Sequence, residues 1–466
     1  MLTYNFHDKG KLPIYICLYN QIKADILGGI LMPNEKLPSK RNLAQHLKIS
    51  VVSVENAYAQ LILEGYIYAL EKKGYFVSPL HDTLPAPVAF PVPKQLVHAA
   101  AKDRSIFDFQ ANTICSGKFP FSIWAKLMRQ TLSEQAAHLL EATPYNGILE
   151  LRKAIADHLY RFRGISVLPE QIVIGAGTEY LYSLIVQLLG RNRIYALEDP
   201  GYQKIAKIYQ SNDASCVFIG LDNSGLSLQE LEASAADIVH ISPAHHFPTG
   251  IVMPIKRRHE LLQWANKKEG RYILEDDYDS EFRFSGKPVQ TLQSIDVNEK
   301  VIYINTFSKS IAPSIRISFM VLPEHLMNKY REDFHFYSCT VPSFEQFTLA
   351  KFIANGYFER HINRMRHYYK RQRDSVIHLL KCSPLRDRIT ILEEDSGLHF
   401  LMKIQTNMSD EAIVKAANKQ GIRLSCLSNY FYDPSRQEDG VIIVNYSGID
   451  YDKTEEAMQR LIKVFM

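Results

Sequence analysis

The chain has 466 residues, of which 46% are hydrophobic and 22% charged, and its formal net charge is +4. This composition excludes large-scale disorder, and the length gives room for two or three domains. No apolar run approaches the ~20 residues that a membrane-spanning helix needs, and residues 1–11 are too polar for a secretory signal, so we expect a soluble, cytoplasmic protein with no membrane partner.

The six cysteines lie far apart and lack the Cys-x-x-Cys spacing that is typical of a zinc site. We therefore expect neither a disulfide framework nor a bound metal. The net charge is too small to indicate nucleic acid by itself, so an indication of DNA binding has to come from a local pattern.

Three helices are predicted at the start of the chain. In the first, Leu18, Ile22 and Ile26 recur every four residues, and Gly28 ends the helix. A short second helix follows Ser39, and a third carries apolar residues at helical spacing. These are Val54, Ala57, Tyr58 and Leu61. Three helices with a tight turn between the second and third predict a helix-turn-helix.

Two short β-prone runs around residues 71–74 predict a hairpin wing after the third helix. Basic side chains here and in the second helix could neutralise DNA phosphates, and the start of the third helix could face base edges in the major groove. Taken singly, each charged residue is better explained as a solvated surface group, so the prediction depends on the motif as a whole. The candidate DNA-binding residues are Ser39, Lys40, Arg41, Val51, Ser53, Lys72 and Lys73.

A proline-rich segment follows, with five prolines between residues 78 and 94 and no helical or alternating period. Such a segment is semi-extended and builds no core. We therefore predict a DNA-binding domain over residues 1–80, a linker over 81–104 and a large domain over 105–466.

In the large domain, predicted strands alternate with predicted helices, which favours an α/β fold with a mostly parallel sheet. Residues 171–190 form one such unit, a strand and a helix joined by a glycine turn. Free backbone N–H groups at the start of a helix suit a phosphate, so Ala176, Gly177 and Thr178 are candidates for a phosphate site.

The stretch from Arg271 to Arg316 carries the strongest chemical signal. An acidic and aromatic cluster, Asp276 to Tyr278, and a lysine, Lys309, each follow a short apolar β-prone run. Because the carboxyl ends of strands in open α/β sheets gather ligand groups, one site could hold all of them. Alone, Asp276 is better explained as a turn residue and Lys309 as a solvated side chain, but the combination favours a site.

A lysine with a reachable amine could hold an aldehyde cofactor as a Schiff base, and pyridoxal 5'-phosphate is the obvious aldehyde. Asp276 would pair with its ring nitrogen and Tyr278 with its ring oxygen. Arg316, with the hydroxyls of Thr306 and Ser308, would bind its phosphate. We assign no catalytic residue.

The segments around Asp276 and Lys309 resemble the cofactor signature of fold-type I aminotransferases. The form of the signature is the one carried by MocR-type, GabR-like regulators of the GntR superfamily. The start of the chain resembles the GntR winged helix at Lys36 to Ser39, Arg41 to Ala44 and Ala57 to Gly65. The resemblance covers nearly the whole chain. It implies a winged helix-turn-helix, a large pyridoxal-phosphate-dependent transferase domain and a small C-terminal α+β subdomain.

The resemblance implies three further properties. Tyr202 would stack on the pyridine ring of the cofactor. His245 and Phe247 would belong to the family's proline-rich loop element. The chain would form a head-to-tail homodimer, whose two winged helices would read paired half-sites in promoter DNA.

Two functions remain open. Aminotransferases of this fold usually hold the substrate carboxylate with an arginine in a late strand, but residues 441–447 contain none. We therefore predict a transcriptional regulator in which an amine, an amino acid or pyridoxal phosphate itself acts through Lys309. The alternative is a working aminotransferase with an attached DNA-binding domain. Lys204 could bind an acidic effector, although a surface lysine explains it equally well.

Overall fold

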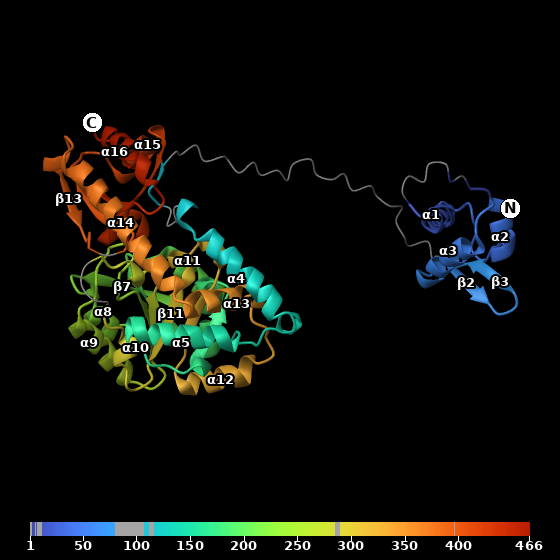
Figure 1. Ribbon diagram of the computed structural model, residues 1–466, viewed down its shortest axis with the longest axis horizontal. Coiled ribbons are helices and arrows are strands. Elements are labelled where there is room, and N and C mark those ends of the chain that lie inside the picture. The colour runs from blue at the N-terminus through green and yellow to red at the C-terminus, as the bar shows by residue number, and fades with distance from the viewer. Residues whose placement is uncertain are drawn as a thin grey trace. The chain divides into compact units, whose positions relative to one another are not determined.

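The structure is a computed structural model that describes residues 2–4, 6, 12–79, 107–110, 116–284, 289–395 and 397–466. The chain divides into two compact units, Met1–Lys102 and Asp103–Met466 (Figure 1). The predicted linker, residues 81–104, lies outside the described residues, so the predicted domain boundaries stay predictions. Within the described part of the chain, no helix is long and apolar enough to cross a membrane.

The first unit combines three helices with a three-stranded antiparallel sheet, in the strand order β1-β3-β2. The wing predicted from the sequence is the hairpin of β2 and β3. The elements are α1 (Ile14–Leu27), β1 (Lys36–Leu37), α2 (Lys40–Leu47), α3 (Val51–Leu63), β2 (Ile67–Leu70) and β3 (Gly74–Val77).

Side chains at helical spacing build the core of this unit, and the apolar positions that the sequence singled out in α1 and α3 are all buried. Serine hydroxyls fix the starts of the second and third helices, since a side-chain oxygen at this position satisfies a free N–H of the first turn. The Ser39 hydroxyl accepts from the Asn42 N–H at 3.2 Å, and the Ser50 hydroxyl accepts from the Ser53 N–H at 3.1 Å.

The second unit is built on an eight-stranded sheet in the order β5-β12-β11-β10-β9-β6-β7-β8. Neighbours from β11 through β7 run parallel, whereas β12 is antiparallel to both of its neighbours and β8 is antiparallel to β7. The strands are β5 (Ile172–Gly175), β6 (Ile194–Asp199), β7 (Ser215–Asp222), β8 (Gly225–Leu226), β9 (Ile238–Ile241), β10 (Tyr272–Asp277), β11 (Val301–Thr306) and β12 (Ser318–Val321).

Helices cover both faces of this sheet, as expected for an α/β fold. They are α4 (Phe121–Glu134), α5 (Leu149–Arg163), α6 (Thr178–Leu189), α7 (Gln203–Ser211), α8 (Leu228–Ala233), α9 (Ile255–Asn266), α10 (Leu292–Ile295), α11 (Phe307–Ser310), α12 (Glu324–Phe334), α13 (Ser343–Ala354) and α14 (Tyr357–Lys381). Alternate residues of β11 face opposite cores: Ile302 and Ile304 pack with α6 and α12, and Tyr303 packs with α5 and α13.

A smaller antiparallel sheet, β13-β14-β17-β16, ends the chain and forms the C-terminal subdomain that was predicted. Helix α14 runs from the large sheet towards this region and packs on α16 (Figure 1). The remaining elements are β4 (Phe107–Asp108), β13 (Ile389–Leu392), β14 (His399–Ile404), α15 (Asp410–Lys419), β15 (Ile422–Arg423), β16 (Ser425–Cys426), β17 (Val441–Asn445) and α16 (Thr454–Lys463), with β4 and β15 paired in parallel.

Candidate functional site

A cavity of about 440 Å³ collects most of the residues that the sequence analysis proposed for the cofactor. It is lined at the carboxyl ends of β6, β10 and β11, where ligands of open α/β sheets bind. Ala176 and Gly177 are the two proposed residues that are not among its lining residues. The proposed residues that line it are Thr178, Tyr202, Asp276, Tyr278, Thr306, Ser308, Lys309 and Arg316.

The alternation of strand β10 separates the two aspartates of the acidic cluster. Successive side chains of a strand point to opposite faces, so Asp276 lines the cavity while Asp277 points away from it. Asp277 forms a buried ion pair with Arg163, with an Nη2–Oδ2 distance of 2.8 Å, and accepts a hydrogen bond from Tyr303 Oη at 2.6 Å. Asp277 therefore belongs to the structural core and Asp276 to the site.

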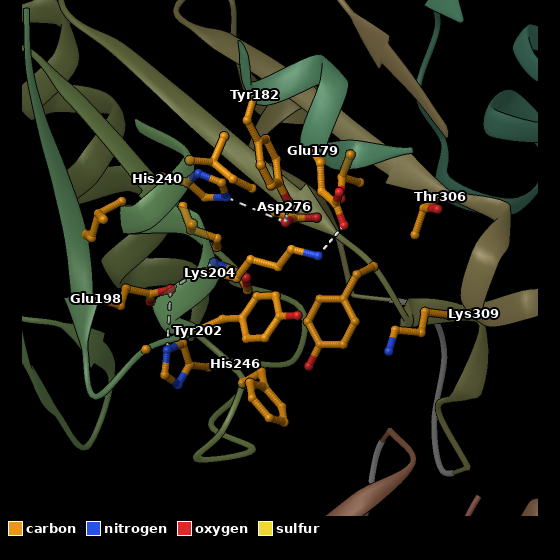
Figure 2. A pocket seen from close by; sticks show the side chains of 18 of the residues that line it. Glu179, Tyr182, Glu198, Tyr202, Lys204, His240, His246, Asp276, Thr306 and Lys309 are labelled. Carbon is orange, nitrogen blue, oxygen red and sulfur yellow. Dashed lines mark hydrogen bonds and ion pairs between the residues drawn. The ribbon is translucent and has the colours of Figure 1, made fainter. Parts of the chain in front are cut away.

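Asp276 is buried and held on one side only. Its Oδ2 accepts a hydrogen bond from Tyr182 and lies 3.5 Å from His240 Nε2, while its Oδ1 has no hydrogen-bond partner within the described part of the chain (Figure 2). His240 Nδ1 is in turn 2.6 Å from Tyr209 Oη. The carboxylate is thus fixed in place with one oxygen left for a ligand. No sequence motif identifies Tyr182 or His240 as a partner of Asp276, because each lies on an element remote in the chain.

Lys309 enters the cavity from the side opposite His240 and Glu198 (Figure 2). It lies in α11, directly after β11, and its Nζ makes no hydrogen bond or ion pair with any residue that the structure describes. Burial lowers the pKa of this amine to about 8, against the opposing effect of Asp279 and Asp276. A larger share of Lys309 is therefore uncharged near neutral pH than for an ordinary lysine, as a nucleophilic amine requires.

This pKa gives a first prediction. Only the neutral amine attacks an aldehyde, so the rate at which cofactor-free protein captures pyridoxal phosphate should rise with pH up to about 8 and level off above it. Stopped-flow absorbance over a pH series measures this rate. A rate that keeps rising tenfold per pH unit beyond pH 9 would show an amine with the usual lysine pKa and contradict the prediction.

Arg316 and Gly177 face each other at the part of the cavity where the sequence analysis placed a phosphate. Gly177 has a φ of +93°, and a Cβ added to it would lie 2.2 Å from Arg316 Nη2, so only glycine allows this approach. Arg316 Nη2 also donates to the Ala176 carbonyl at 3.4 Å. The glycine turn thus helps to position the guanidinium.

The backbone N–H groups of this turn differ from the expectation. The Ala176 N–H donates to Thr340 Oγ1 at 3.0 Å, and the Gly177 N–H donates to the Gly175 carbonyl at 2.8 Å, so neither is free. Thr178, the first residue of α6, lines the cavity directly. Thr178 is therefore the residue of the turn that faces a ligand. The backbone groups of Ala176 and Gly177 stabilise the turn, and the Ala176 carbonyl binds Arg316.

The two hydroxyls beside Lys309 also differ from each other. Thr306 Oγ1 accepts from the Ser318 hydroxyl at 2.7 Å and from the Ser308 N–H at 3.1 Å, which closes the base of the segment between β11 and β12. Ser308 Oγ has no hydrogen-bond partner among the described residues. Lys309 and Arg316 both lie on this segment, and the Ser308 hydroxyl both lines the cavity and lacks a partner among the described residues.

Tyr202 stands at the end of β6 with its ring half exposed, 5.8 Å from the ring of Phe247 in an edge-to-face arrangement. Lys204, two residues further along the chain, is paired with Glu179, and the Glu179 carboxylate also lies 3.8 Å from Arg316. Lys204 is therefore already neutralised by a carboxylate at the cavity.

The candidate DNA-binding residues of the first unit have distinct environments. Arg41, Lys72 and Lys73 are exposed, whereas Lys40 is paired with Glu55 at 2.6 Å. The hydroxyls of Ser39 and Ser53 are both engaged at helix starts, the second through a 2.8 Å contact with Ser50 Oγ. Val51 is an exposed apolar residue at the start of α3.

Comparison with known proteins explains both units. Residues 104–461 match aminotransferase class I and II, and residues 15–77 match the bacterial regulatory proteins of the gntR family. The chain is 36% identical over 451 residues to the HTH-type transcriptional regulator YdeL of Bacillus subtilis, an alignment that covers 97% of this chain and 96% of YdeL. It is 31% identical over 477 residues to the probable rhizopine catabolism regulatory protein MocR of Rhizobium meliloti, covering 98% of this chain and 94% of MocR.

The chain belongs to the MocR-type subfamily of GntR regulators. Its second unit has the fold of the kynurenine aminotransferase of Pyrococcus horikoshii, with a TM-score of 0.67 at 24% identity over 77% of this chain and 90% of that one. As a MocR-type protein it is a DNA-binding transcriptional regulator that depends on pyridoxal phosphate, as the sequence analysis predicted.

The residues present fit this cofactor. Among the residues that the structure describes, Asp276 Oδ1 and Ser308 Oγ have no hydrogen-bond partner and the Lys309 amine makes no hydrogen bond or ion pair, and Gly177 leaves the space that Arg316 occupies. A carboxylate, an amine, a hydroxyl and a guanidinium are the groups that a protonated pyridine ring, an aldehyde and a phosphate require.

Proposed function

We propose that this MocR-type regulator senses an amine, an amino acid or pyridoxal phosphate itself, through a cofactor linked to Lys309. The observation that carries the proposal is the unpartnered Lys309 amine, with a lowered pKa, in a cavity that also holds Asp276. When bound, pyridoxal phosphate supplies an aldehyde that condenses with amines. The protein supplies the positions of the groups around it.

The roles that we propose for the site residues follow their environments. Asp276 Oδ1 would bind the ring nitrogen, and Tyr278 would donate to the ring oxygen. The half-exposed face of Tyr202 would stack on the ring. The phosphate would lie between Arg316 and the start of α6. There it would accept a hydrogen bond from the Ser308 hydroxyl and displace Glu179 from its weak contact with Arg316.

We further propose a head-to-tail homodimer that carries two winged helices and reads paired half-sites in promoter DNA in the cytoplasm. An effector would act by binding one arrangement of these domains more tightly than another. The amine or amino acid would therefore be a signal for DNA binding and not a substrate for continuous turnover.

The second candidate function is a working aminotransferase. For it, the described residues that line the cavity offer no spare arginine to bind the carboxylate of a substrate. Among the described residues that line the cavity, Arg316 is the one arginine, and its proposed partner is the phosphate. Strand β17, the late strand where such an arginine is expected, reads VIIVN. Lys204, the other candidate for binding a substrate carboxylate, is already paired with Glu179.

One experiment separates the two functions. Candidate amines and amino acids are added to the purified protein while cofactor absorbance, keto-acid formation and binding to promoter DNA are followed together. The regulator predicts a spectral change and a change in DNA affinity with no more than one turnover per cofactor. Sustained multiple turnovers would establish the enzyme instead.

The DNA-binding unit gives a prediction of its own. Arg41 is exposed at the start of α2, and an arginine that neutralises a phosphate releases about one counterion. Arg41→Ala should weaken binding to all DNA sequences alike and reduce the slope of log affinity against log salt by about 0.9. Lys40→Ala is the matched control, since Lys40 is already paired with Glu55, and it should change the slope less. Equal slopes for Arg41→Ala and the wild type would remove Arg41 from the interface.

A further inference from the structure

A buried pair, His245 and Asp279, lies directly behind Tyr278. His245 Nδ1 is 2.8 Å from Asp279 Oδ2 and 3.2 Å from Tyr278 Oη. Both side chains of the pair are almost fully buried, at 2% and 3% exposure, and neither lines the main cavity. The pair therefore contacts the cofactor site through the tyrosine hydroxyl, and the charge of Asp279 also acts on the Lys309 amine.

The surroundings determine which nitrogen of His245 carries its proton. A carboxylate can only accept, so the short contact with Asp279 requires a proton on Nδ1. His245 Nε2 is buried and has no hydrogen-bond partner among the residues that the structure describes, so a proton there would lose its hydrogen bonds to water without replacement. Arg163 and Arg283 border the same small cavity as His245.

The His245 ring is closely packed by its neighbours. A Cβ placed on Gly397 would lie 1.9 Å from His245 Cε1, which shows how closely the backbone packs against the ring edge. On its other sides, His245 faces His399, with ring centroids 4.8 Å apart, and the carboxylate of Glu393 acts on it electrostatically. The His399 Nε2 is 3.1 Å from the Pro248 carbonyl, which can only accept, so this nitrogen donates to Pro248 and not to His245.

The proton on Nδ1 fixes the direction of the Tyr278 hydroxyl. Because Nδ1 is a donor, Tyr278 can accept from it but cannot donate to it, and the tyrosine proton is left for the cavity. We infer that Asp279 and His245 are positioning residues that keep Tyr278 a hydrogen-bond donor towards the ring oxygen of the cofactor. The inference rests on the proposed role of Tyr278.

The same logic applies to a catalytic triad, in which an aspartate holds a histidine in one tautomer and asparagine in its place selects the other. In Asp279→Asn, the amide can donate to Nδ1, and the proton moves to Nε2. Nδ1 then becomes an acceptor within reach of Tyr278 Oη, and the tyrosine proton turns away from the cofactor.

The pH at which the Lys309-linked cofactor changes colour is the test. Its titrating proton is shared between the lysine nitrogen and the ring oxygen, so a donor at that oxygen lowers the midpoint. Asp279→Asn should raise the midpoint by about one to two pH units, as should Tyr278→Phe. The double variant should show no further rise, because both changes remove one interaction.

The sign of the shift separates this role from a purely electrostatic one. Loss of the Asp279 charge alone would destabilise the protonated, cationic form and lower the midpoint. Glu393→Gln removes a nearby carboxylate that makes no hydrogen bond to His245 and is the matched control; it should not raise the midpoint. Asp279→Glu keeps a carboxylate and should restore the wild-type value at least in part.

The outcomes are distinguishable. If Tyr278→Phe leaves the midpoint unchanged, the proposed role of Tyr278 fails. If Tyr278→Phe raises it while Asp279→Asn lowers it or leaves it unchanged, the relay through His245 is wrong and the role of Tyr278 stands. A second measurement needs no variant at position 279: ¹⁵N NMR of histidine-labelled protein, with His245 assigned by His245→Gln, should show a proton on Nδ1. A proton on Nε2 alone would overturn the inference.

Discussion

Lys309→Ala should abolish the covalent attachment of the cofactor and, with it, every spectral response to amines. Borohydride reduction of the wild-type protein should leave about one pyridoxyl label per chain, and the variant should carry none, because the other described lysine that lines the cavity, Lys204, is paired with Glu179. Mass spectrometry of the reduced protein measures the label. The winged helix belongs to the other unit, so the variant should still bind DNA but lose its response to the effector.

Lys204→Ala is the matched control, since Lys204 lines the same cavity but is paired with Glu179. It should retain the full label at Lys309. A reducible label on Lys309→Ala at the wild-type level would place the attachment on another residue and disprove the proposed site.

Asp276→Ala should weaken cofactor binding and Asp277→Ala should destabilise the fold, although the two residues are neighbours. Asp276→Ala removes the partner of a charged ring nitrogen, and a hydrogen bond to a charged group contributes about 1.5–3 kcal/mol, so cofactor affinity should fall by about 10- to 100-fold. Asp277→Ala leaves Arg163 buried without its closest partner, which costs about 3–5 kcal/mol of unfolding free energy.

Two measurements on each variant separate the roles. Cofactor titration of the apoprotein should show the lower cofactor affinity of Asp276→Ala. Chemical denaturation should show the lower free energy of unfolding of Asp277→Ala. Asp276→Asn is a milder control, since the amide keeps the shape but provides no charge. Equal losses of stability in both alanine variants, with unchanged cofactor affinity in Asp276→Ala, would contradict the assignment of Asp276 to the site and Asp277 to the core.

Much of the fold and part of the site follow from sequence patterns. Apolar spacing located the helices around Leu18 and Val54, and the β-prone runs before Asp276 and Lys309 are the parallel neighbours β10 and β11. Parallel pairing brings the ends of these strands to one edge, which is why residues some thirty positions apart could be assigned to one cavity. Because side chains alternate between the two faces of a strand, the position of Asp276 and Asp277 next to each other in β10 also implies that they face opposite sides.

The partners across the sheet could not be predicted in this way. Tyr182 and His240 reach Asp276 from α6 and β9, and periodicity identifies the buried face of an element without identifying what lies opposite. The close approach of Arg316 to Gly177 depends likewise on two turns meeting in space. The hydrogen bonds that occupy the Ala176 and Gly177 N–H groups arise from local turn geometry and from Thr340, which no motif connects to them.

The short segment between β11 and β12 has a consequence for how the cofactor is kept. Lys309 and Arg316 share this segment, and the Thr306 and Ser318 hydroxyls join its two ends. The backbone spacing between the proposed covalent anchor, Lys309, and the proposed phosphate anchor, Arg316, is therefore set within one loop, while the turn at Gly177 positions the guanidinium. If β12 separates from β11, both anchors lose their geometry at the same moment, so retention and release of the cofactor become a single cooperative event.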